Sequence, residues 1–144
     1  METKTPYSQE AEESVLGSVF FSENEMKTIA DKLQVEDFYN PNHQEIYKAM
    51  LTLFKNGNSI DVITISTHLE NINALEKAGG RDYVVYLSSL VPSTANLIEY
   101  MNIVKDKSVL RKLQESFTTL IGASRNVENT PEFIDQVENE IFNI

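Results

Sequence analysis

The sequence predicts an all-α fold, in which a small multi-helix globular head is followed by a projecting antiparallel helical hairpin. Apolar side chains recur at steps of three and four between breakers such as Pro41, Gly57 and Pro92, which is typical of amphipathic helices. From about 95 to 125 there is no proline, which predicts about 30 residues of helix, roughly 45 Å long. We therefore place the head at 1–94 and the hairpin, as a dimerisation element, at 95–144.

Composition excludes several classes of protein. The 144 residues include 22 acidic and 12 basic side chains, giving a formal charge of −10, and no cysteine. Without cysteine there is no disulfide framework, thiolate zinc site or cysteine nucleophile. No apolar run approaches the roughly 18 residues of a membrane span. The first eight residues lack the order of a signal peptide, so we expect a cytoplasmic protein with little direct nucleic-acid binding.

Helix starts in the head are expected at residues with N-cap chemistry, and these are Ser8, Ser22, Asn40 and Asp61. Ser22 and Glu25 have the spacing of a capping box. The stretch 60–67 is ambiguous, because six of its eight residues are Ile, Val or Thr, which favour strands. A helix is predicted there, because apolar residues from 62 to 72 follow a 3, 4, 3 spacing.

The hairpin carries apolar seams on both of its predicted helices. Thr130 and Pro131 restart a helix after a short break, so an antiparallel pair is the expected geometry. Two helices that project beyond a globule cannot cover all these side chains, and a second copy of the hairpin is the simplest cover. The candidates for this dimer contact are Leu110, Leu113, Phe117, Ile134, Val137 and Ile141.

Basic residues cluster on the long helix, whereas the last helix is acidic. The cluster from Lys105 to Lys112 contains four bases, and the segment after Arg125 contains five acids and no base. We expect the cluster to form a solvated face that pairs with the acidic last helix. The alternative is a small helical nucleic-acid-binding regulator that uses the same cluster to contact phosphates.

Catalytic motifs are absent from the sequence. No glycine-rich loop is followed by Gly-Lys-Ser/Thr, so the chain should not hydrolyse a nucleotide alone. His43 and His68 each lack a second histidine at ligand spacing, so no metal site is predicted. Phe38 and Tyr39 form either an exposed stacking pair or the closure of a small core, and we favour the core.

An ordered series of motifs resembles the N-terminal domain of bacterial replicative DNA helicases, the DnaB family. The series spans about residues 6 to 144, and the match lies in the order and gaps of the motifs. It consists of Glu10-Ala11-Glu12, Val15-Leu16-Gly17-Ser18-Val19, Glu36-Asp37-Phe38-Tyr39, Ile60-Asp61-Val62-Ile63-Thr64, Leu75-Glu76-Lys77-Ala78-Gly79-Gly80, Val91-Pro92-Ser93-Thr94-Ala95-Asn96 and Lys107-Ser108-Val109-Leu110-Arg111.

The resemblance implies a scaffold. In the family these domains form a collar, a trimer of dimers on the hexameric motor, which recruits the C-terminal helicase-binding domain of primase and also interacts with helicase loaders. ATP and Mg²⁺ belong to the motor domain, which we expect to be missing from this chain, so no catalytic, cofactor or metal residue is expected here.

The resemblance also suggests roles for individual residues. Positions implicated in the primase contact correspond to Glu10, Tyr83, Gln114 and Leu120. Tyr83 equally fits half-buried packing, and Leu120 fits the hairpin core. By the same analogy, the head is built with Phe38, Tyr39 and His43, and it contains a tight turn at Gly79 and Gly80.

Overall fold

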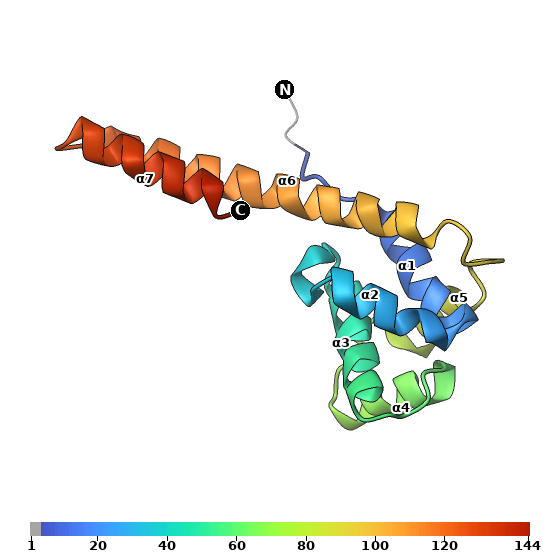
Figure 1. Ribbon diagram of the computed structural model, residues 1–144. Coiled ribbons are helices and arrows are strands. Elements are labelled where there is room, and N and C mark those ends of the chain that lie inside the picture. The colour runs from blue at the N-terminus through green and yellow to red at the C-terminus, as the bar shows by residue number, and fades with distance from the viewer. Residues whose placement is uncertain (1–3) are drawn as a thin grey trace.

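Helices are the regular elements of residues 4–144, the part of the chain that this computed structural model describes. They are α1 (Gln9–Phe21), η1 (Glu23–Glu25), α2 (Met26–Lys32), η2 (Val35–Asp37), α3 (Pro41–Lys55), α4 (Val62–Asn71), α5 (Gly80–Ser88), α6 (Leu97–Ala123), η3 (Ser124–Asn126) and α7 (Thr130–Phe142). The all-α prediction is confirmed. In Figure 1, α1 to α5 form a head, and α6 crosses it and extends beyond it. None of the described helices is long and apolar enough to cross a membrane.

Side-chain caps start three of the helices. Ser8, Asp61 and Asn129 each accept a hydrogen bond from the backbone amide three residues later, at 3.2, 2.8 and 3.1 Å. Such a bond satisfies an amide that has no partner within its helix. Asn40 occupies the N-cap position of α3 but makes no capping bond, and its side chain donates instead to the side chain of Gln9.

The capping box predicted at Ser22 and Glu25 is wrong, although Ser22 does occupy an N-cap position. The Ser22 side chain caps no amide, and a 3₁₀ turn, η1, precedes α2, which begins only at Met26. The carboxylate of Glu23 accepts a hydrogen bond from the amide of Ile60 at 2.9 Å. This contact joins the turn to the loop before α4.

The ambiguous β-branched stretch forms a helix, α4, as its apolar spacing predicts. Asp61 and Thr64 cap its start reciprocally, because each side chain accepts from the amide of the other, at 2.8 and 2.9 Å. Ile65 and Leu69 are fully buried, whereas Ile63 is 66% exposed. A helix is favoured over a strand here, because helical spacing places two large side chains on the same face, in the core.

The turn before α5 requires glycine. Gly79 and Gly80 have φ values of +101° and +82°, a region that residues with a Cβ atom rarely adopt. A Cβ on Gly79 would also lie 3.0 Å from the ring of Tyr83. The turn therefore fixes where α5 begins and where Tyr83 lies.

The core of the head centres on α1 and α3. Val15, Leu16 and Val19 of α1 are fully buried, and α1 packs against α3, α5 and α6. On α3, Tyr47 is fully buried, and its hydroxyl donates to the carbonyl of Leu33 at 2.7 Å. The central position of α1 explains why polar groups on its inner face need partners of their own.

The two halves of α6 have different neighbours. Its first half buries Leu97, Met101 and Val104 against the head. Its second half leaves the head, and α7 turns back along it (Figure 1). Between these two helices, Ser116 donates to Glu140 at 3.2 Å, and Leu120 is 9% exposed. No residue of α7 is fully buried, so the outer faces of both helices remain open.

Candidate functional site

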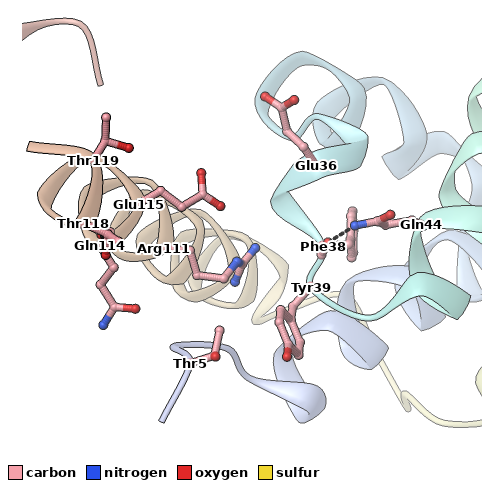
Figure 2. Close-up of a pocket in the computed structure, with 10 residues that line it drawn as sticks. All are labelled: Thr5, Glu36, Phe38, Tyr39, Gln44, Arg111, Gln114, Glu115, Thr118 and Thr119. Carbon is pink, nitrogen blue, oxygen red and sulfur yellow. Dashed lines mark hydrogen bonds between the residues drawn. The ribbon is translucent and has the colours of Figure 1, made fainter. Parts of the chain in front are cut away.

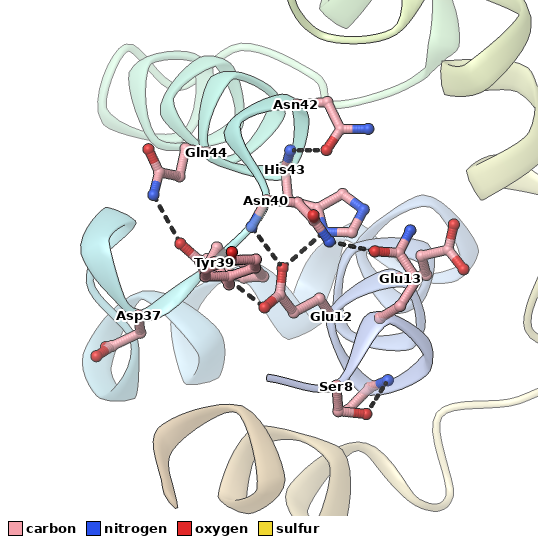
Figure 3. A network of polar contacts seen from close by, with 12 residues as sticks. Ser8, Glu12, Glu13, Asp37, Tyr39, Asn40, Asn42, His43 and Gln44 are labelled. Atoms are coloured by element: carbon pink, nitrogen blue, oxygen red, sulfur yellow. Dashed lines mark hydrogen bonds and ion pairs between the residues drawn. The ribbon is translucent and has the colours of Figure 1, made fainter. Parts of the chain in front are cut away.

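A network of polar side chains connects α1 to the start of α3 inside the head (Figure 3). The Nδ1 atom of His43 lies 2.7 Å from the Oε1 atom of Glu12. The Glu12 carboxylate also accepts from the backbone amides of Tyr39 and Asn40, at 2.9 and 3.3 Å. Glu12 thus lies at the N-terminus of α3, where the helix dipole favours a negative charge. His43 is fully buried, and the network fixes the start of α3 against α1.

Tyr83 extends this network to α5. Its hydroxyl lies 2.6 Å from the Nε2 atom of His43 and donates to Glu13 at 2.7 Å. Burial, together with the hydrogen bond to Glu13 and its charge, raises the pKa of Tyr83 well above its ordinary value. Tyr83 is half-buried, so the packing role is present, while its ring also stacks on the exposed Tyr86 at 5.8 Å.

A groove of about 800 Å³ lies where the hairpin leaves the head (Figure 2). Its lining residues come from the N-terminal segment, from the stretch that runs from η2 into α3, and from α6. They are Thr5, Glu36, Phe38, Tyr39, Gln44, Arg111, Gln114, Glu115, Thr118 and Thr119. Phe38 is fully buried beneath the groove, whereas Tyr39 is 38% exposed. The two predicted head aromatics therefore lie in different environments.

Arg111 contacts several of the segments that form the groove. Its guanidinium donates to the carbonyl oxygens of Pro6 and Asp37, at 2.8 and 2.9 Å. It also lies 5.4 Å from the centroid of the Tyr39 ring, which stacks on Tyr7 at 4.4 Å. The planar fork of arginine suits two carbonyls and an aromatic face at once. Arg111 therefore connects α6 to the N-terminal segment and to η2.

Asp37 is the second connection between head and hairpin. Its fully buried carboxylate accepts from Ser108 at 2.7 Å, from Lys105 at 3.1 Å and from the amide of Gln34 at 2.7 Å. Burial alone would raise the pKa of Asp37, but these hydrogen bonds and the Lys105 charge hold it below its ordinary value.

The predicted pairing of the basic cluster with the last helix is wrong. Lys105 pairs with Asp37, and Lys112 lies 3.5 Å from Glu36, while Arg111 binds head carbonyls. These bases lie on the half of α6 that faces the head, whereas α7 covers the other half. With three of its four bases bound to the head, the cluster gives little support to the nucleic-acid alternative.

The four predicted primase contacts fall into two groups. Glu10 is exposed on the first turn of α1, and its neighbour Gln9 donates to the Tyr83 hydroxyl at 3.5 Å. Gln114 is exposed on α6 and lines the groove, whereas Leu120 is buried on the distal part of α6. The structure therefore offers one candidate contact surface on the head and one beside the hairpin.

The dimer candidates differ in exposure. Leu110, Phe117, Ile134 and Ile141 are 45%, 49%, 51% and 36% exposed, and Leu113 and Val137 are partly buried. Within residues 4–144 no group of three His, Cys, Asp or Glu side chains is placed to hold a metal ion. The hairpin thus presents apolar surface rather than chemically reactive groups.

The sequence pattern alone predicted no individual role for Glu12, Glu13, Asp37 or Arg111. One signal for Glu12 was available, because it lies three and four positions before Val15 and Leu16 and so shares their apolar face. A charge on a buried stripe needs a partner. The contacts between Asp37 and α6, and those of Arg111, carry no comparable signal, because they join residues more than 60 positions apart.

Comparisons with known proteins agree with this architecture. Residues 4–106 match the family model of the DnaB-like helicase N terminal domain. The chain is 35% identical over 141 residues to replicative DNA helicase DnaC of Bacillus subtilis and 36% identical over 146 residues to replicative DNA helicase DnaB of Leifsonia xyli. These matches cover 96% and 99% of the chain but only 31% and 32% of those relatives.

Two solved structures share the fold. The crystal structure of the N-terminal domain of DnaB helicase from Mycobacterium tuberculosis has a TM-score of 0.88, with 33% identity over 98% of this chain and 100% of that one. A structure of a DnaB-like replicative helicase and its interactions with primase has a TM-score of 0.80, with 25% identity over 95% of this chain and 31% of that one. The chain therefore belongs to the family of DnaB-like helicase N-terminal domains.

Proposed function

We propose that this chain is the noncatalytic collar domain of a replicative DNA helicase, which assembles through its hairpin and recruits primase. The observation that carries the proposal is the similarity in fold, over 95% of the chain, to a DnaB-like replicative helicase described with its primase interactions. ATP and Mg²⁺ chemistry is assigned to a motor domain outside these 144 residues. A helicase loader is a further expected partner of the same collar.

Open apolar surface on the hairpin supports self-association. Two helices alone bury one stripe between them, which leaves large side chains exposed on α6 and α7. Those on the part of α6 that α7 accompanies, and on α7 itself, include Leu110, Phe117, Ile121, Ile134 and Phe142. A second hairpin with the same surface would cover them in a two-fold contact, and three such pairs would complete a ring.

Substitutions on α7 test the assembly. Ile134→Asp places a charge on the exposed apolar face and should leave the monomer folded while weakening the dimer at least tenfold. Gln136→Asp adds the same charge on the opposite side of α7 and should leave association unchanged. Val137→Asp, at a partly buried position, should also lower thermal stability. Sedimentation velocity over a concentration series measures association, and undiminished association of Ile134→Asp would contradict the proposed interface.

Calorimetric titration with the C-terminal helicase-binding domain of the same organism's primase tests recruitment. The assembled chain should bind it, and Glu10→Lys or Gln114→Ala should weaken binding severalfold. Glu76→Lys, an equivalent charge reversal on an exposed loop residue between α4 and α5, is the control. Absence of binding by an assembled chain would remove primase from the proposal and leave the assembly role standing.

A further inference from the structure

Four side chains in the head form an unbroken series of short contacts. Glu12 Oε1 lies 2.7 Å from His43 Nδ1, and His43 Nε2 lies 2.6 Å from the Tyr83 hydroxyl. The Tyr83 hydroxyl lies 2.7 Å from Glu13 Oε2. The exposed fractions of Glu12, His43 and Glu13 are 1%, 0% and 8%, whereas Tyr83 is partly exposed, so the Glu12–His43 contact is the most shielded from water. Three contacts thus join two carboxylates, one imidazole and one phenol.

The number of protons in this series decides its chemistry. Each hydrogen bond needs one proton between its two heavy atoms, so three bonds need three protons. Ionised carboxylates contribute none, a neutral imidazole contributes one, and the phenol contributes one. With those ordinary forms, one of the three contacts would bring two acceptor atoms face to face at less than 3 Å. The geometry therefore requires one additional proton.

The surrounding groups indicate where the additional proton resides. The Glu12 carboxylate already accepts from two backbone amides, which favours its ionised form. The Tyr83 hydroxyl donates to Glu13, so its own proton is not available to His43. Both ring nitrogens of His43 must then be donors, one to Glu12 and one to Tyr83.

The charges nearby lead to the same assignment. Among residues 4–144, no lysine or arginine nitrogen lies within 4.0 Å of the carboxylate of Glu12 or Glu13. The other groups facing the series are the amides of Gln9 and Asn40 and the ring of Tyr86. Two buried carboxylates without a cationic partner would be costly, and an imidazolium at His43 supplies that partner.

We propose that the folded head binds one proton within the Glu12–His43–Tyr83–Glu13 series, carried as an imidazolium at His43. This proton joins α1, α3 and α5, because each bond in the series links side chains from two of these helices. The folded state then holds one more proton than the unfolded chain above about pH 6.5, where a free imidazole is neutral. Stability should therefore rise as pH falls, by up to tenfold in the folding constant per pH unit, and level off below about pH 6.5.

Nitrogen-15 spectra of the histidine rings test the protonation state directly. The chain has only two histidines, and His68, which is partly exposed and lies outside the series, is an internal reference. At about pH 7.5, His43 should show two protonated ring nitrogens with slow exchange, and its signals are compared with those of His68 in the same spectrum. A singly protonated His43 under those conditions would overturn the proposal.

A matched pair of variants tests the proton count. In Glu13→Gln the new amide donates to the Tyr83 oxygen, the Tyr83 proton turns to His43 Nε2, and three bonds form without an additional proton. This variant should fold, show a neutral His43, and lose most of the dependence of unfolding on pH above about 6.5. Glu10→Gln removes the same charge from the exposed face of α1 and should keep the wild-type dependence. Identical pH profiles for wild type and Glu13→Gln would contradict the assignment.

Discussion

Asp37 illustrates how a single buried carboxylate connects distant parts of the chain. Its hydrogen bonds come from Ser108 and Lys105 on α6 as well as from the amide of Gln34 beside it. Because the folded state holds its pKa below the ordinary value of 3.8, the ionised form stabilises the fold. That contribution is complete above the unfolded pKa and is lost as pH falls through the folded pKa.

Asp37→Asn should therefore lower the free energy of unfolding by about 2 kcal/mol at neutral pH, because it removes charge-assisted hydrogen bonds. The difference from wild type should begin to shrink below the unfolded pKa of about 3.8 and should be lost as pH falls through the lower folded pKa, where the native carboxylate becomes protonated. Urea unfolding at about pH 7 and about pH 3 measures both values. Asp106→Asn, at an exposed position on α6, is the control, and an equal loss at both pH values would argue against the ionised role.

At the scale of elements, two glycines in helical surroundings have opposite requirements. Gly79 precedes α5 with a positive φ of +101°, and a Cβ atom there would meet the Tyr83 ring at 3.0 Å. Gly122 lies within α6, and a Cβ atom there would have no neighbour within 4 Å. The same substitution should consequently act in opposite directions at these two sites.

Gly79→Ala should cost about 1–2 kcal/mol, since alanine is strained at positive φ and its methyl group displaces Tyr83. Gly122→Ala should instead stabilise the chain by about 0.5–1 kcal/mol, because alanine restricts the unfolded chain and favours helix. Thermal and urea unfolding of the two variants measure the difference. Stabilisation by Gly79→Ala would show that the turn before α5 does not constrain the head.

At the scale of the whole molecule, the first half of α6 is fixed to the head and the second half projects beyond it. Leu97, Met101 and Val104 pack its first half on the head, and Arg111 is the polar anchor at the point where the helix departs. The adjacent Lys112 makes a contact of 3.5 Å with Glu36, both being well exposed. Exposed ion pairs of this kind contribute only about 0–1 kcal/mol.

Arg111→Gln should lower stability by about 1–2 kcal/mol and broaden the range of hairpin orientations, because two carbonyl bonds and the Tyr39 contact are lost. Lys112→Gln removes the same charge one residue away and should change neither property appreciably. Because the chain has no cysteine, spin labels on cysteines introduced at Lys55 and Asn126 report the head-to-hairpin distance alone. A narrow distribution in Arg111→Gln would assign the orientation of α6 to apolar packing only.

Interactions between residues close in sequence made much of the fold predictable from the sequence. The caps at Ser8 and Asp61, the positive-φ turn at Gly79 and the 3, 4, 3 spacing in α4 depend on neighbours within a few residues. Such interactions are the same in most folds, so their sequence signatures predict helices and breaks reliably. The ordered motifs also sufficed to identify the family to which the chain belongs.

Partners across long sequence separations were decided only by the tertiary structure. Glu23 accepts a hydrogen bond from the amide of Ile60, and Lys105 pairs with Asp37 rather than with the acidic last helix. The sequence by itself determined which side chains are apolar, charged or able to cap a helix. Tertiary packing alone determines which charged side chains come together in the protein interior, where the dielectric constant is low. Both the Asp37 connection and the proton-binding series at His43 result from this packing.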